Sequence, residues 1–228
     1  MHRVGIVIPA AGRGRRFGAA HPKQFFRLNG QPILLKTLRI FHGIRAIKEI
    51  VVVAPAKYLK DVERLIRSSR LNKVTRIVAG GWERQHSVWN GLTSFTRPPD
   101  IVLVHDAVRP LVTRVIIEEV IRQSARHKAA AAGVRVKDTV KVEGRKGFYT
   151  KTLDRSRLWV VQTPQGFRFA TLMNAHLMAR KSRFLGTDEA SLVERLGIPV
   201  KIVEGSIRNI KITAKEDVPL AKWLSRMR

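Results

Sequence analysis

Short apolar runs alternate with helical patterns along the first 130 residues. The runs hold about five residues, mostly β-branched, and stop at Gly, Pro or Asp, which is typical of strands covered on both faces. They lie at residues 4–8, 50–54, 75–78 and 101–104. The apolar positions between them recur at helical spacing: Leu34, Leu38 and Phe41; Leu59, Val62 and Leu65/Ile66; and, after a candidate N-cap at Thr113, Val115/Ile116, Val120 and Ile121. This alternation predicts an α/β fold with a Rossmann-like, mostly parallel twisted sheet flanked by helices.

The pattern changes after residue 130. Residues 129–134 form another buried strand in this interpretation, and the alternation on either side of Gly144 and Gly147 predicts a β-hairpin. A hairpin inserted into a parallel sheet usually projects outward. We therefore expect residues 135–160 to form an arm that reaches a partner subunit.

The remaining segment predicts two helices, two strands and a final helix. The helices are expected around 169–180 and 188–196, and the strands at 200–204 and 210–213. The last helix could begin at Thr213, where a capping-box pattern occurs, or at Asp217. The first choice places Pro219 inside the helix, where it would remove a hydrogen bond, and the sequence leaves both choices open.

Composition limits the classes of protein that this chain can belong to. Its 228 residues are 44% hydrophobic, which suits one folded domain over residues 1–228. The absence of cysteine excludes disulfides and a thiol nucleophile. No apolar stretch reaches the ~18 residues of a membrane span. Residues 4–11 faintly resemble a signal peptide, but the arginines that follow argue against it, so we expect a first buried strand and a cytoplasmic protein.

The charge points to a polyanionic partner. Lys and Arg number 44 against 17 Asp and Glu, which gives a net charge of +27. Nucleic acid, acidic lipid and a phosphate-rich small substrate would each fit this charge. Aromatic residues make up only 7% of the chain and mostly fall on predicted apolar faces, so we expect nucleic acid to bind only by nonspecific adhesion.

A glycine-rich turn follows the first predicted strand. Gly12, Gly14 and Gly18 fit neither the phosphate-binding P-loop pattern nor the dinucleotide fingerprint. Small residues still allow a ligand to approach the backbone, whose amides can bind phosphate oxygens, and Arg16 and Lys23 add full charges. From the glycines alone, an ordinary turn with solvated arginines is an equal alternative.

Further motifs along the chain narrow these possibilities. In order they are Pro9-Ala-Ala-Gly-x-Gly-x-Arg16, Pro22-Lys-Gln24, Gly80-Gly-x-x-Arg84-x-x-Ser87, His105-Asp-Ala-x-Arg-Pro110, Asp138-Thr-x-Lys141, Asp154-Arg-Ser-x-Leu-Trp159, Gln162-Thr-Pro-Gln-Gly-Phe167, Thr187-Asp-Glu-Ala-Ser191 and Asn209-Ile-Lys-x-Thr213. This ordered set resembles the 2-C-methyl-D-erythritol 4-phosphate cytidylyltransferases across nearly the whole chain. Each motif is moderately specific, and their order is strongly so.

The resemblance implies transfer of a cytidylyl group from CTP to the phosphate of methylerythritol phosphate, with release of pyrophosphate. The attacking phosphate oxygen is already anionic, so the reaction needs positioning and cations rather than a general base. By similarity, Arg16 and Lys23 stabilise the α-phosphate, while Arg155 and Lys211 hold the second phosphate.

The resemblance also implies the residues that bind each substrate. The nucleotide would contact Ala10, Ala11, Gly12, Gly14, Gly81, Ser87, Asp106 and Ala107, and the second substrate would contact Arg109, Thr139, Thr163 and Thr187. Asp106 would lie nearest Mg²⁺ or another divalent cation, which takes few protein ligands.

The resemblance further implies a homodimer with shared active sites, in which Arg155 and Thr139 serve the neighbouring subunit. Two positions depart from the family pattern. Trp82 stands where relatives often carry a polar or acidic residue, beside the base, and Val108 also occurs in relatives that use ribitol phosphate. Those relatives are the closest alternative, and the motifs at 154–159 and 187–191 favour methylerythritol phosphate.

Overall fold

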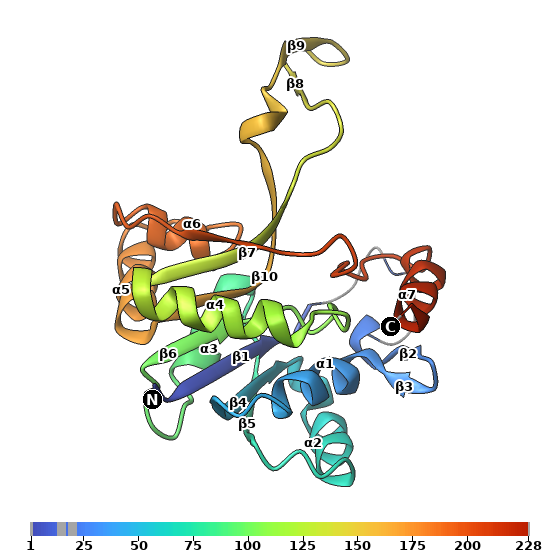
Figure 1. Ribbon diagram of the computed structural model, residues 1–228. Coiled ribbons are helices and arrows are strands. Elements are labelled where there is room, and N and C mark those ends of the chain that lie inside the picture. The colour runs from blue at the N-terminus through green and yellow to red at the C-terminus, as the bar shows by residue number, and fades with distance from the viewer. Residues whose placement is uncertain (1, 13–16, 18–21, 228) are drawn as a thin grey trace.

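The computed structural model describes residues 2–12, 17 and 22–227 of the chain. Its main sheet has seven strands in this described part, in the order β11-β7-β10-β6-β1-β4-β5 (Figure 1). The strands are β1 (Val4–Pro9), β4 (Ile47–Ala54), β5 (Val74–Ala79), β6 (Ile101–Val104), β7 (Ala129–Arg135), β10 (Trp159–Arg168) and β11 (Lys201–Glu204). Strand β10 runs antiparallel to both neighbours, and the other pairs are parallel. The predicted mostly parallel α/β fold is confirmed.

Helices cover both faces of this sheet. Alternation along β1 shows why: Ile6 and Ile8 enter the core shared with one set of helices, and Val7 enters the core shared with the other. The first set is α1 (Ile33–His42), α2 (Leu59–Ser68) and α4 (Arg114–His127). The second set is α3 (Arg84–Leu92), α5 (Phe169–Lys181) and α6 (Glu189–Glu194). The resulting three layers leave the carboxyl ends of the central strands open for a site.

Two helix boundaries show how local sequence sets the ends. Thr113 caps α4, since its hydroxyl accepts a hydrogen bond from the Ile116 amide at 3.4 Å, as predicted. Helix α7 (Asp217–Arg226) begins at Asp217, so Pro219 lies in the first turn, where a missing amide costs little. The Asp217 carboxylate accepts hydrogen bonds from the Thr213 and Ala214 amides at 2.6 and 2.9 Å. It thereby ties the preceding loop to the helix.

Three elements differ from the sequence prediction. Residues 210–213 were expected as a strand but form a loop, in which a backbone bond from Ile212 to Val108 of 3.0 Å replaces a strand ladder. Strand β10 was not foreseen, because its register shifts between Val161 and Gln165 and interrupts the alternation. Helix α3 was also missed, since its sequence carries few apolar residues.

The predicted hairpin is confirmed and projects from the body of the molecule (Figure 1). It contains β8 (Lys141–Glu143), β9 (Tyr149–Thr152) and the short 3₁₀ helix η4 (Arg155–Arg157). Every residue of β8 and β9 is exposed. We call residues 135–160 the arm. A second small ribbon, β2 (Arg27–Leu28) with β3 (Gln31–Pro32), lies beside α7. Within the described residues, no helix has both the length and the apolar character needed to cross a membrane.

Candidate active site

A pocket of about 450 Å³ lies at the carboxyl ends of the central strands. This is the edge at which open α/β sheets usually bind ligands. The pocket combines small residues from the end of β1 with charged side chains from several loops. Its described lining is Pro9, Ala10, Ala11, Gly12, Lys23, Gln24, Gly80, Gly81, Trp82, Glu83, Arg84, Ser87, Asp106, Ala107, Val108 and Lys211.

Close backbone packing shapes one wall of this pocket. A Cβ atom at Gly80 would lie 2.2 Å from the Cβ of Ala11, and one at Gly81 would lie 2.5 Å from the Cβ of His86. Only glycine permits such contacts without displacement of the neighbours. The Gly81 amide also donates a 3.1 Å hydrogen bond to the Ser87 hydroxyl, which fixes the loop against the first turn of α3. A side chain at either glycine would therefore displace this wall of the pocket.

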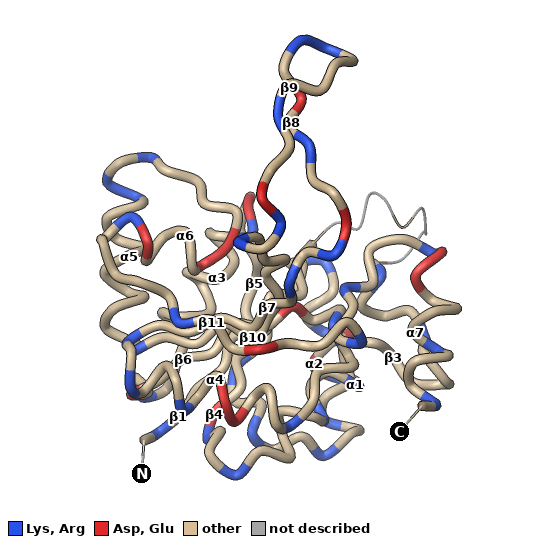
Figure 2. The backbone as a smooth tube through the Cα atoms, turned by 45° about the horizontal axis from the view of Figure 1, so that its top comes forward, with Lys and Arg blue, Asp and Glu red and all other residues tan. Residues whose placement is uncertain are grey.

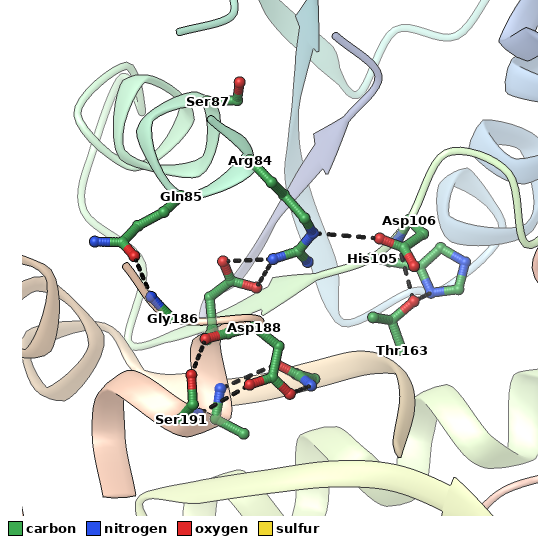
Figure 3. Close-up of polar contacts among 12 residues, drawn as sticks. Arg84, Gln85, Ser87, His105, Asp106, Thr163, Gly186, Asp188 and Ser191 are labelled. Carbon is green, nitrogen blue, oxygen red and sulfur yellow. Dashed lines mark hydrogen bonds and ion pairs between the residues drawn. The ribbon is translucent and has the colours of Figure 1, made fainter. Parts of the chain in front are cut away.

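Asp106 is the electrostatic centre of the site. It lies two residues after the end of β6 and is 7% exposed. Its carboxylate lies 3.5 Å from Arg84 Nε, 3.3 Å from Arg109 Nε and 3.0 Å from Lys211 Nζ. Burial alone would raise the pKa of Asp106, but Arg84, Lys211 and Arg109 outweigh it and hold that pKa far below its usual range. The group is a permanent carboxylate beside three cations, of which Figure 3 shows Arg84.

Arg84 is held on its other side by a buried carboxylate. Its Nη1 atom donates to both oxygens of Glu189, at 2.8 and 2.7 Å, and Glu189 is 1% exposed. Burial lowers the pKa of Arg84, but the charges of Glu189 and Asp106 raise it above its usual value, so the guanidinium stays charged. Arg84 thus bridges the start of α3, the start of α6 and the end of β6 with a single orientation.

A second pocket, of about 240 Å³, adjoins the first. Arg84, Asp106 and Lys211 line both pockets. The rest of its described lining is mostly polar: Arg109, Val161, Gln162, Thr163, Gln165, Thr187 and Asp188. Two anionic groups placed in the two pockets would therefore face the same cations. That arrangement is what the joining of two phosphate-bearing molecules needs.

A neutral histidine positions Asp106 from behind. His105 is fully buried, its Nδ1 lies 3.1 Å from the Thr163 hydroxyl, and its Nε2 lies 3.1 Å from the Arg109 carbonyl. The Thr163 hydroxyl oxygen accepts from the Asp106 amide at 3.0 Å, so its proton goes to Nδ1 and Nε2–H donates to the carbonyl (Figure 3). Burial lowers the pKa of His105 to about 4. It is a structural group here rather than a general base.

Most of the residues expected from the sequence meet at these pockets. Ala10, Ala11, Gly12, Lys23, Gly81, Ser87, Asp106, Ala107 and Lys211 line the larger pocket, and Arg109, Thr163 and Thr187 line the smaller one. Arg16 and Gly14 lie outside the described residues. Arg155 and Thr139 lie on the arm, are exposed and line neither pocket of their own chain. Arg155 instead donates a 2.6 Å hydrogen bond to the Lys137 carbonyl within the arm.

Sequence reasoning assigned no role to two residues that organise the site. Glu189 neutralises Arg84, and Gln165 donates to Asp188 at 2.6 Å and accepts from the Ala190 amide at 3.1 Å. Asp188 caps α6 by accepting from the Ser191 amide at 2.9 Å (Figure 3). An arginine taken out of water needs an acid beside it, but only the fold shows that Arg84 is in such a place. Nothing in the sequence showed which acid it would be.

The donor set can be compared with the expected divalent cation. No cluster of three His, Cys, Asp or Glu side chains suited to a metal occurs among the described residues. Asp106 nevertheless stays ionised and lines both pockets. Mg²⁺ commonly binds one or two carboxylates and several phosphate oxygens. The residues present therefore fit an ion that is held mainly by a nucleotide.

Comparisons with known proteins agree along the whole chain. The sequence profile of the 2-C-methyl-D-erythritol 4-phosphate cytidylyltransferase family matches residues 4–226. A cytidylyltransferase of that name from Pelotomaculum thermopropionicum is 47% identical over 233 residues, covering 100% of this chain and 96% of its own. The crystal structure of the Thermus thermophilus enzyme has a TM-score of 0.80 at 32% identity, with 100% of both chains covered. That of 4-diphosphocytidyl-2C-methyl-D-erythritol synthase from Anaerococcus prevotii has a TM-score of 0.86 at 26% identity, covering 99% of this chain and 96% of its own.

Fold and pockets together define an α/β nucleotidyltransferase, whose cations face two adjoining anion sites. The chain belongs to the 2-C-methyl-D-erythritol 4-phosphate cytidylyltransferase family. Its reaction is the transfer of CMP from CTP to 2-C-methyl-D-erythritol 4-phosphate in isoprenoid biosynthesis. The expectation drawn from the ordered motifs is confirmed.

Proposed function

We propose that the larger pocket binds CTP and the smaller pocket binds the phosphate of methylerythritol phosphate. The observation that carries this division is the sharing of Arg84, Asp106 and Lys211 by both pockets. The α-phosphate of CTP and the incoming phosphate would meet at these side chains. Repulsion between two anions is the main barrier to this reaction, so cations at the junction supply the needed stabilisation.

The chemical step needs no proton transfer. An oxygen of the methylerythritol phosphate attacks the α-phosphorus of CTP, a new phosphorus–oxygen bond forms, and the bond to the β-phosphate oxygen breaks to release pyrophosphate. Lys23, Arg16 and Lys211 stabilise the charge that develops at the α-phosphate, and Lys211 also holds the attacking group. Asp106 supports this step by keeping Arg84 and Lys211 in fixed positions before the substrates arrive.

The remaining pocket residues divide between base, ribose and phosphates. Ala10, Ala11, Gly81 and Ser87 would enclose cytosine, and Ala107 would lie at the ribose. The amides of Gly12 and Gly14 would bind phosphate oxygens. A magnesium ion bound to CTP, with Asp106 as its nearest carboxylate, would neutralise part of the triphosphate charge. The use of CTP also supports the expected cytoplasmic location.

We propose that the active enzyme is a homodimer with shared sites, built from chains that each form a single domain over residues 1–228. Arg109, Thr163 and Thr187 would bind methylerythritol phosphate from the same chain. Arg155 and Thr139 would reach it from the arm of the second chain. The support is that both arm residues are exposed and stand apart from both pockets of their own chain.

A two-substrate assay tests the proposed reaction. Pyrophosphate release should require both CTP and methylerythritol phosphate, and ATP, GTP or UTP should replace CTP poorly. Ribitol phosphate is the matched competitor for the second substrate. Equal or faster turnover with ribitol phosphate would reassign the second substrate, and release without any second substrate would contradict the proposal.

A mixing experiment tests the shared site separately. Lys211→Ala and Arg155→Ala chains should each be nearly inactive alone. In a shared-site dimer, half of the randomly mixed dimers carry both variants, and one of their two sites is intact. Activity should therefore return to about a quarter of the wild-type value after equal mixing. No recovery, with mixed dimers verified by mass spectrometry, would place Arg155 and Lys211 in the same chain's site.

A further inference from the structure

We propose that the indole ring of Trp82 covers the larger pocket and stacks on the pyrimidine ring of CTP. This inference rests on the proposed binding of CTP in that pocket. It gives a function to a side chain that departs from the family pattern. In this arrangement Trp82 contacts the flat face of the base, and other residues contact its edge.

The first observation is the exposure of Trp82. At 91% exposed, it is the most exposed of the large hydrophobic side chains in the described part of the chain. Two of the other three tryptophans have cationic partners: Arg180 lies 4.8 Å from the ring of Trp89, and Arg135 lies 4.7 Å from that of Trp159. Trp82 enters none of the ring pairs or cation–π contacts found among the described residues. A single exposed apolar side chain is common on protein surfaces, so the exposure of Trp82 gains meaning only from its place at the pocket.

The second observation is the place of Trp82 in the pocket. Among the described residues that line the larger pocket, it is the only aromatic one. Its backbone continues directly from Gly80 and Gly81, which are fixed by close packing against Ala11 and His86. The ring therefore extends from a firmly held loop at the pocket wall. Its own freedom is confined to the side-chain torsions, so closing over a ligand requires no rearrangement of the fold.

Stacking has consequences that differ from hydrogen bonding. Aromatic stacking on a base adds affinity with little preference for the type of base, because every base presents a flat face. Recognition of cytosine is then left to groups that reach the base edge. Trp82 should consequently strengthen the binding of CTP and UTP by a similar factor, and should not touch the phosphates or the second substrate.

The test compares Trp82→Ala and Trp82→Phe with Trp223→Ala, a control at another exposed tryptophan, on α7 and outside both pockets. Calorimetry on the full chain measures the Kd of CTP with Mg²⁺ and, as a probe without a base, of tripolyphosphate. We expect the Kd of CTP to rise about 5- to 100-fold in Trp82→Ala and to recover largely in Trp82→Phe. The Kd of tripolyphosphate, the KM for methylerythritol phosphate and the ratio of CTP to UTP affinity should stay near the wild-type values. Trp223→Ala should behave as wild type.

Two results would overturn the role of Trp82. One is an unchanged Kd of CTP in Trp82→Ala. The other is an equal loss of tripolyphosphate binding, which would mean that the substitution disturbs the pocket as a whole. Failure of the wild-type chain to bind CTP would instead contradict the proposed function. Because Trp82 is almost fully exposed, its replacement removes no core contact, and a matching unfolding midpoint verifies the fold.

Discussion

The pocket edge of the sheet and the arm are stabilised in different ways. At the pocket, charged groups are buried and paired: Asp106, Arg109 and Glu189 are 7%, 9% and 1% exposed. On the arm, β8 and β9 pair only with each other and bury no residue, and even Phe148 and Tyr149 are 65% and 77% exposed. Figure 2 shows basic and acidic residues along an extended loop of chain that stands clear of the body.

This difference shows which contacts define each region. An isolated two-stranded hairpin is at best marginally stable in water. The arm therefore has few contacts with its own chain to hold it in place, whereas the pocket takes its geometry from the core beneath it. Substitutions of the buried charged groups at the pocket should change stability and turnover together. Substitutions on the arm should change assembly and turnover while the body stays as stable as before.

The largest expected effect is on the buried pair at the pocket. Glu189→Ala leaves the guanidinium of Arg84 next to the core without its closest carboxylate. Removing one partner of a buried pair costs about 3–5 kcal/mol, so the free energy of unfolding should fall by this amount in urea titrations. Glu194→Ala, at an exposed position of the same helix, is the matched control. A loss below about 1 kcal/mol would show that the pair contributes no more than a surface ion pair.

Lys211 should separate turnover from stability at the same edge. Its side chain is 39% exposed, so Lys211→Ala should lower stability little. Turnover should drop about 10²- to 10³-fold, by analogy with the loss of one group that stabilises developing charge. Lys215→Ala, four positions along the chain and exposed, should retain activity. Steady-state pyrophosphate release measures both variants, and a tenfold effect or less at Lys211 would remove it from the chemical step.

The parts of the fold that follow from regular patterns could be predicted from the sequence. Strand β6 and residues 50–54 of β4 are continuous apolar runs, and helices α1, α2 and α4 keep their apolar spacing. Strand β10 escaped prediction because Gln162 and Thr163 stand where alternation would place core residues. They face the smaller pocket instead. Polar residues that line the pocket thus interrupt the apolar alternation of this strand.

The candidate site was predictable only as a set of residues. The motifs identified Lys23, Asp106 and Lys211 as site residues, but the distances between these side chains depend on long-range packing. The pairing of Arg84 with Glu189 spans 105 positions and has no local signature. The two arm residues remain a prediction from resemblance alone, because neither spacing nor charge distinguishes Arg155 from the other surface arginines.

At the arm, a large change should impair assembly and turnover but leave the stability of the body nearly unchanged. Lys141 and Thr152 are paired, so residues 140–150 can be replaced by a short glycine link that joins nearby ends. We expect a monomer by light scattering, at least a tenfold loss of turnover, and a thermal midpoint close to that of the wild type, because β8 and β9 contribute no core. Substituting Arg145 and Lys146, which are among the replaced residues, by Ala in the intact arm is the control for lost charge. A fully active monomer would exclude the shared site.

The smallest expected effect is a pH dependence confined to the body. Burial lowers the pKa of His105 and of His176 to about 4 in the folded chain, where the charges of Arg84, His86 and Arg180 also act on His176. In the unfolded chain both histidines titrate near about 6.5, so between these values the unfolded state binds more protons. Stability is therefore fully present above about pH 6.5 and is lost as the pH falls toward 4. Between pH 6.5 and 5.5 the loss should be about 1 kcal/mol per histidine.

Chemical unfolding at pH 6.5 and 5.5 measures this loss of stability. A substitution at one histidine separates its contribution from that of the other. Neither ring nitrogen of His176 has a hydrogen-bond partner among the described residues, so His176→Leu should halve the pH dependence without exposing a new polar group. His127→Gln, at an exposed position in α4, should leave it unchanged. The arm-deleted chain should retain the full dependence, because residues 135–160 contain no histidine. A smaller dependence in that chain would mean that the arm stabilises the body through contacts that its exposed strands do not reveal.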